Sequence, residues 1–153
     1  MTEYEPNFNN NFFSFLKKDQ NKLWVQKLFE KILQYNSIDN IRFSGFKTSD
    51  GKIPDGLLET NDIVCLIENK TLASTSSTQL CNYAKSLLKD FSQDKKKYLL
   101  LLAPPFTQTN IAVKQFSESE YFHKVNFIRI TCKEFCERLE GIKCQPEFLK
   151  MIL

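Results

Sequence analysis

The chain has 153 residues, of which 42% are hydrophobic and 25% are charged, and its formal net charge is +3. These values are typical of one soluble globular domain that is large enough to bury a core. The longest apolar run, 98–106, is too short to cross a bilayer and contains two prolines. The first 18 residues lack the basic start and apolar centre of a secretory signal, and the chain has five cysteines. We therefore expect an intracellular protein with free thiols and no membrane partner.

From the N-terminus, the hydrophobic pattern alternates between helical and strand periodicity after an irregular segment at 1–18. The segment 74–79 supplies hydroxyls that can cap the second helix, which should run to residue 91. In chain order we expect a helix at 22–35, strands at 41–46, 53–59 and 63–69, and then the second helix, which ends at 91. After it we expect a strand at 98–104, a helix at 110–119, a strand at 125–131, and closing helices at 132–153.

This order of elements predicts an α/β fold with a mixed central sheet and helices on both of its faces. The runs at 63–69 and 98–104 are apolar almost throughout, as in strands that are buried on both sides. No internal repeat or long linker divides the chain. We therefore expect a single domain over 1–153, with its core at about 22–131.

The apolar run at 63–69 ends in polar residues that a central strand would not normally carry. Side chains alternate along a strand, so Glu68 and Lys70 should point to the same face, beyond the apolar Val64 and Leu66. A buried carboxylate is costly unless it is paired or binds a metal. If Asp55 lies on the preceding strand of a hairpin, its carboxylate can reach the same pocket. Two carboxylates, a main-chain oxygen and water suit Mg²⁺, and a neighbouring lysine suits phosphodiester hydrolysis.

Pro54-Asp55, twelve intervening residues and then Glu68-Asn69-Lys70 resemble the signature of the PD-(D/E)xK nuclease superfamily. That superfamily has the restriction-endonuclease-like fold with an αβββαβ core, which implies the same core here. The resemblance implies that Asp55 and Glu68 bind Mg²⁺ or Mn²⁺, that the main-chain carbonyl of Asn69 is a further ligand, and that Lys70 is catalytic. It also implies that the protein is a nuclease acting on DNA.

Gln79 and Tyr83, on the helix after the lysine, resemble the Q-x-x-x-Y motif of the RecB-like branch of this superfamily. Their spacing places both on one helical face, at the edge of the apolar stripe. The resemblance implies that they support the site or the substrate. The alternative is that Tyr83 is an ordinary core residue whose hydroxyl lies in water.

Other acids and simpler interpretations stay open. Many members of the superfamily draw a further acid from the first helix, and Glu30 is the candidate, though it lies outside the apolar face and can equally be solvated. Glu59 shares the strand parity of Asp55 and is a spare acid near a turn. Without a metal, Asp55 would be a turn residue after proline, and Glu68 with Lys70 a surface ion pair.

Lysines form a candidate nucleic-acid surface. Lys85 and Lys89 fall opposite the apolar stripe of their helix, and Lys95, Lys96 and Lys97 cluster after it. Such a group can follow phosphates, or it can be a solubilising face.

The remaining reactive residues do not indicate a second kind of site. Cys132, Cys136 and Cys144 invite comparison with the iron–sulfur clusters of some RecB-like nucleases, but those clusters also use a cysteine well upstream of the active site. No cysteine here precedes Cys65, so no iron–sulfur cluster is expected. His123, the only histidine, should be exposed in a polar loop.

Two alternatives to a DNA nuclease remain. The chain can be a degenerate nuclease fold that binds nucleic acid or protein without cleavage, or an RNA endonuclease with the same chemistry. The intact set of two acids and a lysine favours cleavage. A homodimer or a partner protein is the expected source of substrate specificity, because a chain this short has no obvious recognition domain.

Overall fold

The structure of the chain is a computed structural model, and it describes residues 18, 22–35, 40–45, 47, 51, 53–70, 74–131, 134 and 137. The expected irregular segment at 1–18 and the closing helices at 132–153 lie almost entirely outside these residues.

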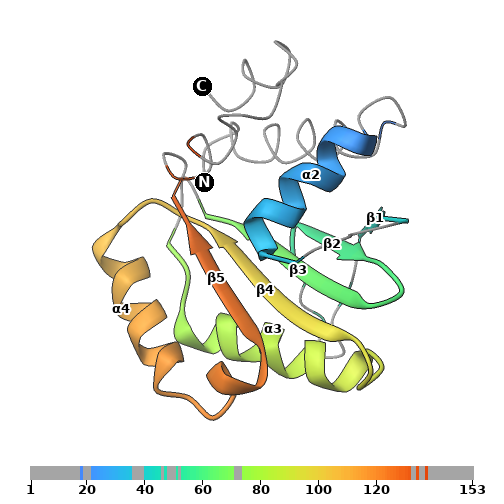
Figure 1. Cartoon of the computed structure of the whole chain (residues 1–153). Coiled ribbons are helices and arrows are strands. Elements are labelled where there is room, and N and C mark those ends of the chain that lie inside the picture. The colour runs from blue at the N-terminus through green and yellow to red at the C-terminus, as the bar shows by residue number, and fades with distance from the viewer. Residues whose placement is uncertain are drawn as a thin grey trace.

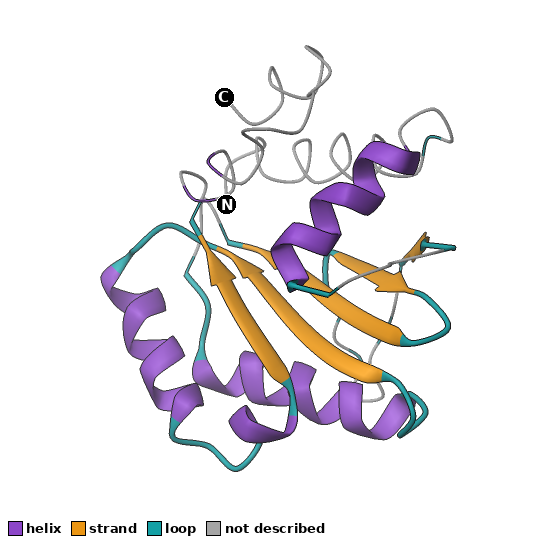
Figure 2. Cartoon of the chain, in the orientation of Figure 1, coloured by secondary structure: helices purple, strands orange, loops and turns teal. Residues whose placement is uncertain are grey.

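The expected order of helices and strands is confirmed in the described part of the chain (Figures 1 and 2). Boundaries differ by a few residues, chiefly because the first two strands are shorter than their patterns. The elements are α2 (Lys22–Leu33), β1 (Arg42–Ser44), β2 (Gly56–Glu59), β3 (Ile63–Asn69), α3 (Ser77–Asp90), β4 (Lys96–Leu102), α4 (Thr107–Ser117), the 3-10 helix η2 (Phe122–Lys124) and β5 (Asn126–Ile130).

The strands form one mixed sheet in the order β1-β2-β3-β4-β5. β1, β2 and β3 are joined antiparallel, whereas β3, β4 and β5 are parallel. A parallel pair needs a crossover connection, and α3 and α4 supply the two crossovers. β3 is therefore the central strand, and every one of its residues is buried.

Helices cover both faces of the sheet, as the sequence predicts. α2 packs on the face to which Ile63, Cys65 and Ile67 of β3 point. α3 packs on the opposite face with Val64 and Leu66, and Ala112 and Phe116 of α4 are also buried. Figure 1 shows α2 across one side of the strands and α3 across the other. The alternation along β3 thus decides which side chains face α2 and which face α3.

The turn between β2 and β3 fixes the register of this hairpin. The hydroxyl of Thr60 accepts hydrogen bonds from the main-chain amides of Asp62 and Ile63, each at 3.1 Å. The amide of Thr60 in turn donates to the carbonyl of Ile63 at 2.9 Å. Gly56 then pairs with Ile67, near the other end of the hairpin. A one-residue slip would turn every side chain of β2 to the wrong face, so this turn also sets which residues meet at the far end.

Candidate active site

The hairpin register brings Asp55 to Glu68. Because Gly56 pairs with Ile67 in an antiparallel ladder, the next residues outward, Asp55 and Glu68, are neighbours across the strands. The carboxylate of Asp55 is held in place by the chain itself: its Oδ2 accepts a hydrogen bond of 2.6 Å from the main-chain amide of Asn69. The arrangement predicted from the spacing of the two acids is the one that the structure contains.

Lys70 lies beside Glu68 at the end of β3. Its main-chain amide donates to the carbonyl of Leu102 at 2.7 Å, so the backbone stays extended beyond the last residue of the strand. Its ammonium Nζ lies 4.0 Å from Oε1 of Glu68, and 19% of the lysine side chain is exposed against 5% for the glutamate. The lysine can therefore reach both the buried carboxylate and solvent.

The environment of Glu68 disfavours its charged form. Burial is the largest cause, and the neighbouring Asp55 adds to it, so that the pKa of Glu68 rises to about 8. A hydrogen bond from Tyr83 and the charge of Lys70 act in the opposite direction but are weaker. Oε2 of Glu68 is buried and has no hydrogen-bond partner among the described residues. Within the described part of the chain, the buried Glu68 carboxyl therefore has one oxygen to which another group could bind.

Gln79 and Tyr83 both join this site. α3 begins at the N-cap Ser76, whose side chain accepts from the amide of Gln79 at 3.1 Å. Nε2 of Gln79 donates to the hydroxyl of Tyr83 at 3.2 Å, and that hydroxyl lies beside Glu68, whose pKa it lowers as a hydrogen-bond donor. Tyr83 is only 1% exposed, so the alternative with its hydroxyl in water is wrong.

Tyr83 keeps its proton in this setting. Burial, followed by the hydrogen bond to Glu68 and the nearby carboxylates, raises the pKa of Tyr83 well above its usual range. Thr75, which the sequence indicated only as part of a capping segment, donates from Oγ1 to Oε1 of Gln79 at 2.7 Å. Only the folded helix start shows that this one hydroxyl, out of a run of five, faces the glutamine.

The residues present fit a divalent metal ion. Asp55 and Glu68 place two carboxylates in contact, and one Glu68 oxygen is buried without a partner among the described residues; such a pair is a donor set that Mg²⁺ or Mn²⁺ prefers. Within the described ranges, no group of three or more histidine, cysteine, aspartate or glutamate side chains gathers where a metal could bind. Within the described part of the chain, further ligands would come from main-chain oxygen or water, and the role of the Asn69 carbonyl stays a prediction.

Among the described residues, neither Glu30 nor Glu59 forms a group of three acids with this pair. Glu30 belongs to α2, on the face of the sheet opposite the Glu68 side chain, and its Oε1 accepts from Nε2 of Gln26 at 3.4 Å. Glu59 lies at the other end of β2, where its carboxylate meets Nζ of Lys95 at 2.5 Å. Sequence parity was therefore insufficient to identify a third acid.

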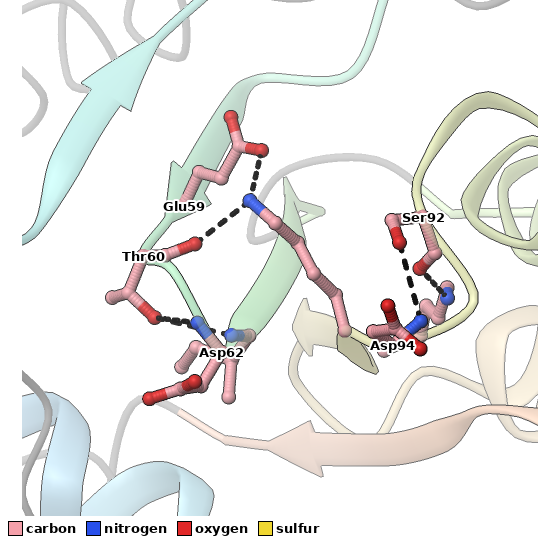
Figure 3. A network of polar contacts seen from close by, with 8 residues as sticks. Glu59, Thr60, Asp62, Ser92 and Asp94 are labelled. Carbon is pink, nitrogen blue, oxygen red and sulfur yellow. Dashed lines mark hydrogen bonds and ion pairs between the residues drawn. The ribbon is translucent and has the colours of Figure 1, made fainter.

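The lysine cluster also lies far from Glu68. Lys96 pairs with Ile63 at the start of β3, five residues before Glu68, which corresponds to about 16 Å along the strand. The ammonium of Lys95 binds Glu59 and the carbonyl of Thr60, the latter at 2.8 Å (Figure 3).

The other lysines of the cluster have partners as well. Lys96 lies over the rings of Tyr35 and Tyr98, at 5.5 and 5.4 Å, and Lys97 is 7% exposed and donates to the carbonyl of Ser92. By contrast, Lys85 and Lys89 are exposed on α3. Nucleic-acid binding by these lysines stays a prediction, and the contacts of the 95–97 group are structural.

A comparison with family models decides the family. The model described as the PD-(D/E)XK nuclease superfamily matches residues 55–151. The chain belongs to the PD-(D/E)XK nuclease superfamily. The matched region begins at Asp55 and contains the whole site from β2 to α3, and the five-stranded mixed sheet is the restriction-endonuclease-like arrangement that the motif implied. Comparison with the curated proteins gave no match. Membership of the RecB-like branch stays a prediction.

The other predicted features have simpler outcomes. His123 is exposed, as expected, in η2. Cys65 is buried and Cys81 half-buried, and both are free thiols. Cys132, Cys136 and Cys144 lie outside the described residues. Among the described helices, none combines the length and the apolar character needed to span a bilayer.

Proposed function

We propose that this member of the superfamily is a Mg²⁺- or Mn²⁺-dependent nuclease that hydrolyses phosphodiester bonds in DNA. The supporting observation is the contact between the carboxyl groups of Asp55 and Glu68, with the ammonium of Lys70 4.0 Å from Glu68. Asp55, Glu68 and the main-chain carbonyl of Asn69 would hold the metal. When bound, such an ion polarises the phosphate and lowers the pKa of a bound water.

Each side chain of the site has a separate task in this proposal. The Asn69 amide fixes the Asp55 carboxylate, so this ligand is oriented before the ion binds. Lys70 orients the hydrolytic water and balances the negative charge that develops on the phosphate. Tyr83 donates its hydroxyl to Glu68 and excludes water from that side of the carboxylate. Gln79 holds the Tyr83 hydroxyl.

The alternatives differ in substrate or in the absence of cleavage. An inactive domain that binds nucleic acid or protein would retain the unfavourable burial of Glu68 beside Asp55 without any use for it, which is why we favour catalysis. An RNA endonuclease would use the same groups. A homodimer or a partner protein is the proposed source of specificity, and light scattering with and without DNA tests the first of these.

The test is a cleavage assay on linear and circular DNA, on single and double strands, and on RNA, each with Mg²⁺, Mn²⁺ or EDTA. We expect DNA to be cut only with a metal, and Lys70→Ala to reduce the rate by about 10²- to 10⁴-fold, as loss of a proton-transfer group does. Lys114→Ala, on the exposed side of α4, is the matched control and should cut normally.

The outcome distinguishes the candidates. Cleavage of RNA alone would replace the DNA substrate by RNA and leave the chemistry intact. Cleavage that persists in EDTA or in Lys70→Ala would contradict the proposed site. Binding of nucleic acid without any cleavage would favour the inactive domain.

A further inference from the structure

Two hydrogen bonds connect Thr75 to Tyr83, and the Tyr83 hydroxyl lies beside the buried carboxyl of Glu68. Oγ1 of Thr75 lies 2.7 Å from Oε1 of Gln79, and Nε2 of the same amide lies 3.2 Å from the hydroxyl of Tyr83. The Tyr83 hydroxyl in turn lies beside Glu68 and, as a hydrogen-bond donor, lowers the pKa of that carboxyl. Thr75 and Tyr83 are buried, with 8% and 1% of their surface exposed, so water does not readily replace these bonds.

The chemistry of the last group fixes the direction of the whole chain. The form in which Glu68 would bind a metal is the ionised carboxylate, which can only accept hydrogen bonds, so Tyr83 then donates its single proton to Glu68. The tyrosine oxygen must then accept from Gln79, which requires the NH₂ end of the amide to face Tyr83. The carbonyl end of the amide consequently faces Thr75, whose hydroxyl donates to it. With the amide turned round, the tyrosine proton would point at Gln79 and away from Glu68.

Thr75 is the group that selects this amide orientation. Without the Thr75 hydroxyl, the side-chain carbonyl of Gln79 would lose its donor. The Gln79 amide would then have no preference for one of its two orientations over the other. The start of α3 does not depend on it, because the neighbouring Ser76 caps the main-chain amide of Gln79 at 3.1 Å. The roles are thus divided: Ser76 begins the helix, and Thr75 orients the glutamine side chain.

We propose that Thr75 is a positioning residue of the metal site: through Gln79 and Tyr83 it directs a hydrogen bond onto Glu68 and so sets the orientation of this metal ligand. The inference rests on the proposed function and extends it to a residue outside the motif. Loss of an outer-shell partner of a metal ligand typically lowers metal affinity about 10- to 100-fold.

The first test measures Mn²⁺ binding to the full chain by calorimetry. Thr75→Val keeps the shape of the side chain without the hydroxyl, and we expect its Kd to rise about 10- to 100-fold. Thr75→Ser keeps the hydroxyl and should bind nearly as the wild type does. Thr109→Val is the matched control, because Thr109 is fully buried on α4 and its hydroxyl has no partner among the described residues. It should leave the Kd unchanged.

The second test asks whether Thr75 acts through Tyr83. Tyr83→Phe should weaken Mn²⁺ binding, and Thr75→Val added to it should cause no further loss, because the chain is already broken. The same double-mutant cycle, measured by urea unfolding in EDTA, should be non-additive without any metal.

These tests separate the inference from the proposed function. Two results would overturn the inference while the nuclease proposal stands. One is a Thr75→Val variant that binds Mn²⁺ with the wild-type Kd. The other is a double variant in which the affinity losses of Thr75→Val and Tyr83→Phe multiply. Wild-type protein that binds no Mn²⁺ would instead contradict the proposed function, and the metal-free cycle would then decide the coupling of Thr75 to Tyr83. Additive effects in that cycle overturn the coupling.

Discussion

The two ends of β3 both bring carboxylates and a lysine together, with opposite results. At the end where β3 starts, Glu59 meets one ammonium, that of Lys95, at 2.5 Å, and this lysine also binds the Thr60 carbonyl at 2.8 Å (Figure 3). At the other end, Glu68 lies against a second acid, Asp55, and its lysine stays 4.0 Å away.

The two ends differ in how completely their charged groups are paired within the described part of the chain. The Glu59 pair is compact and half-exposed, so each charge is matched and neither carboxylate nor ammonium needs anything more. The Glu68 pair is buried, has an oxygen without a partner among the described residues, and has a raised pKa. A buried carboxyl with a raised pKa and an oxygen open to another partner is suited to an added cation, whereas the Glu59–Lys95 ion pair is not.

The largest expected difference between the two ends is in metal binding. Glu68→Gln should weaken Mn²⁺ binding by more than about a hundredfold, beyond the range for outer-shell groups, because it removes a ligand charge. Glu59→Gln makes the same chemical change in the ion pair with Lys95, near the start of β3, and should leave Mn²⁺ binding unchanged. Calorimetry on both variants checks this comparison. Equal losses in the two variants would show that the protein's overall charge, and not this site, controls the binding.

The next effect is the pH dependence of stability without metal. Folded Glu68 keeps its proton up to a pKa of about 8, whereas the unfolded chain releases it near 4.5. Between these values the folded state binds more protons, so the free energy of unfolding should fall as pH rises from 5 to 8, by roughly a few kcal/mol. Urea unfolding in EDTA measures this fall.

Two controls assign that pH dependence to Glu68. Glu68→Gln cannot ionise there and should show a flatter profile over the same range. Added Mg²⁺ should restore wild-type stability chiefly at pH 8, where the carboxylate is available to bind it. A wild-type profile parallel to that of Glu68→Gln would contradict the assignment.

The smallest effect is expected on the free energy of unfolding, at the start of β3 where Glu59 pairs with Lys95. Lys95→Met should lower the free energy of unfolding by about 1 kcal/mol, because it removes a partly exposed ion pair and one hydrogen bond to a carbonyl. The loss should shrink in 1 M salt, which screens the pair in the wild type. DNA cleavage should be unaffected. Reduced cleavage at unchanged stability would instead support the predicted role of this lysine in nucleic-acid binding.

The sequence was sufficient to predict that Asp55 and Glu68 lie opposite each other, because local rules determine that geometry. The apolar run ending in Glu68 predicts a central strand, and a hairpin with alternating side chains then brings Asp55 opposite it. Both steps depend on neighbours along the chain and across one turn. The fold class followed from the same alternation of helices and strands.

The sequence was insufficient where partners come from distant positions. Lys95 is near Glu59 only because β4 lies parallel to β3, and such a contact has no local signal. The side of the sheet on which α2 packs likewise has no local signal in the sequence. The sequence did not identify Thr75 for a different reason. Several hydroxyl side chains precede α3, and only the folded start of the helix shows which one contacts Gln79.

The described side chains of the site all come from one continuous stretch, from Asp55 to Tyr83, comprising a hairpin and the helix that follows. Contacts between residues close in sequence form faster in folding than distant ones, since their loops are short. The pocket can thus assemble before β5 docks on the sheet. Substitutions in α4 or β5 should then reduce activity in proportion to the fraction of unfolded chains, with the rate per folded molecule preserved.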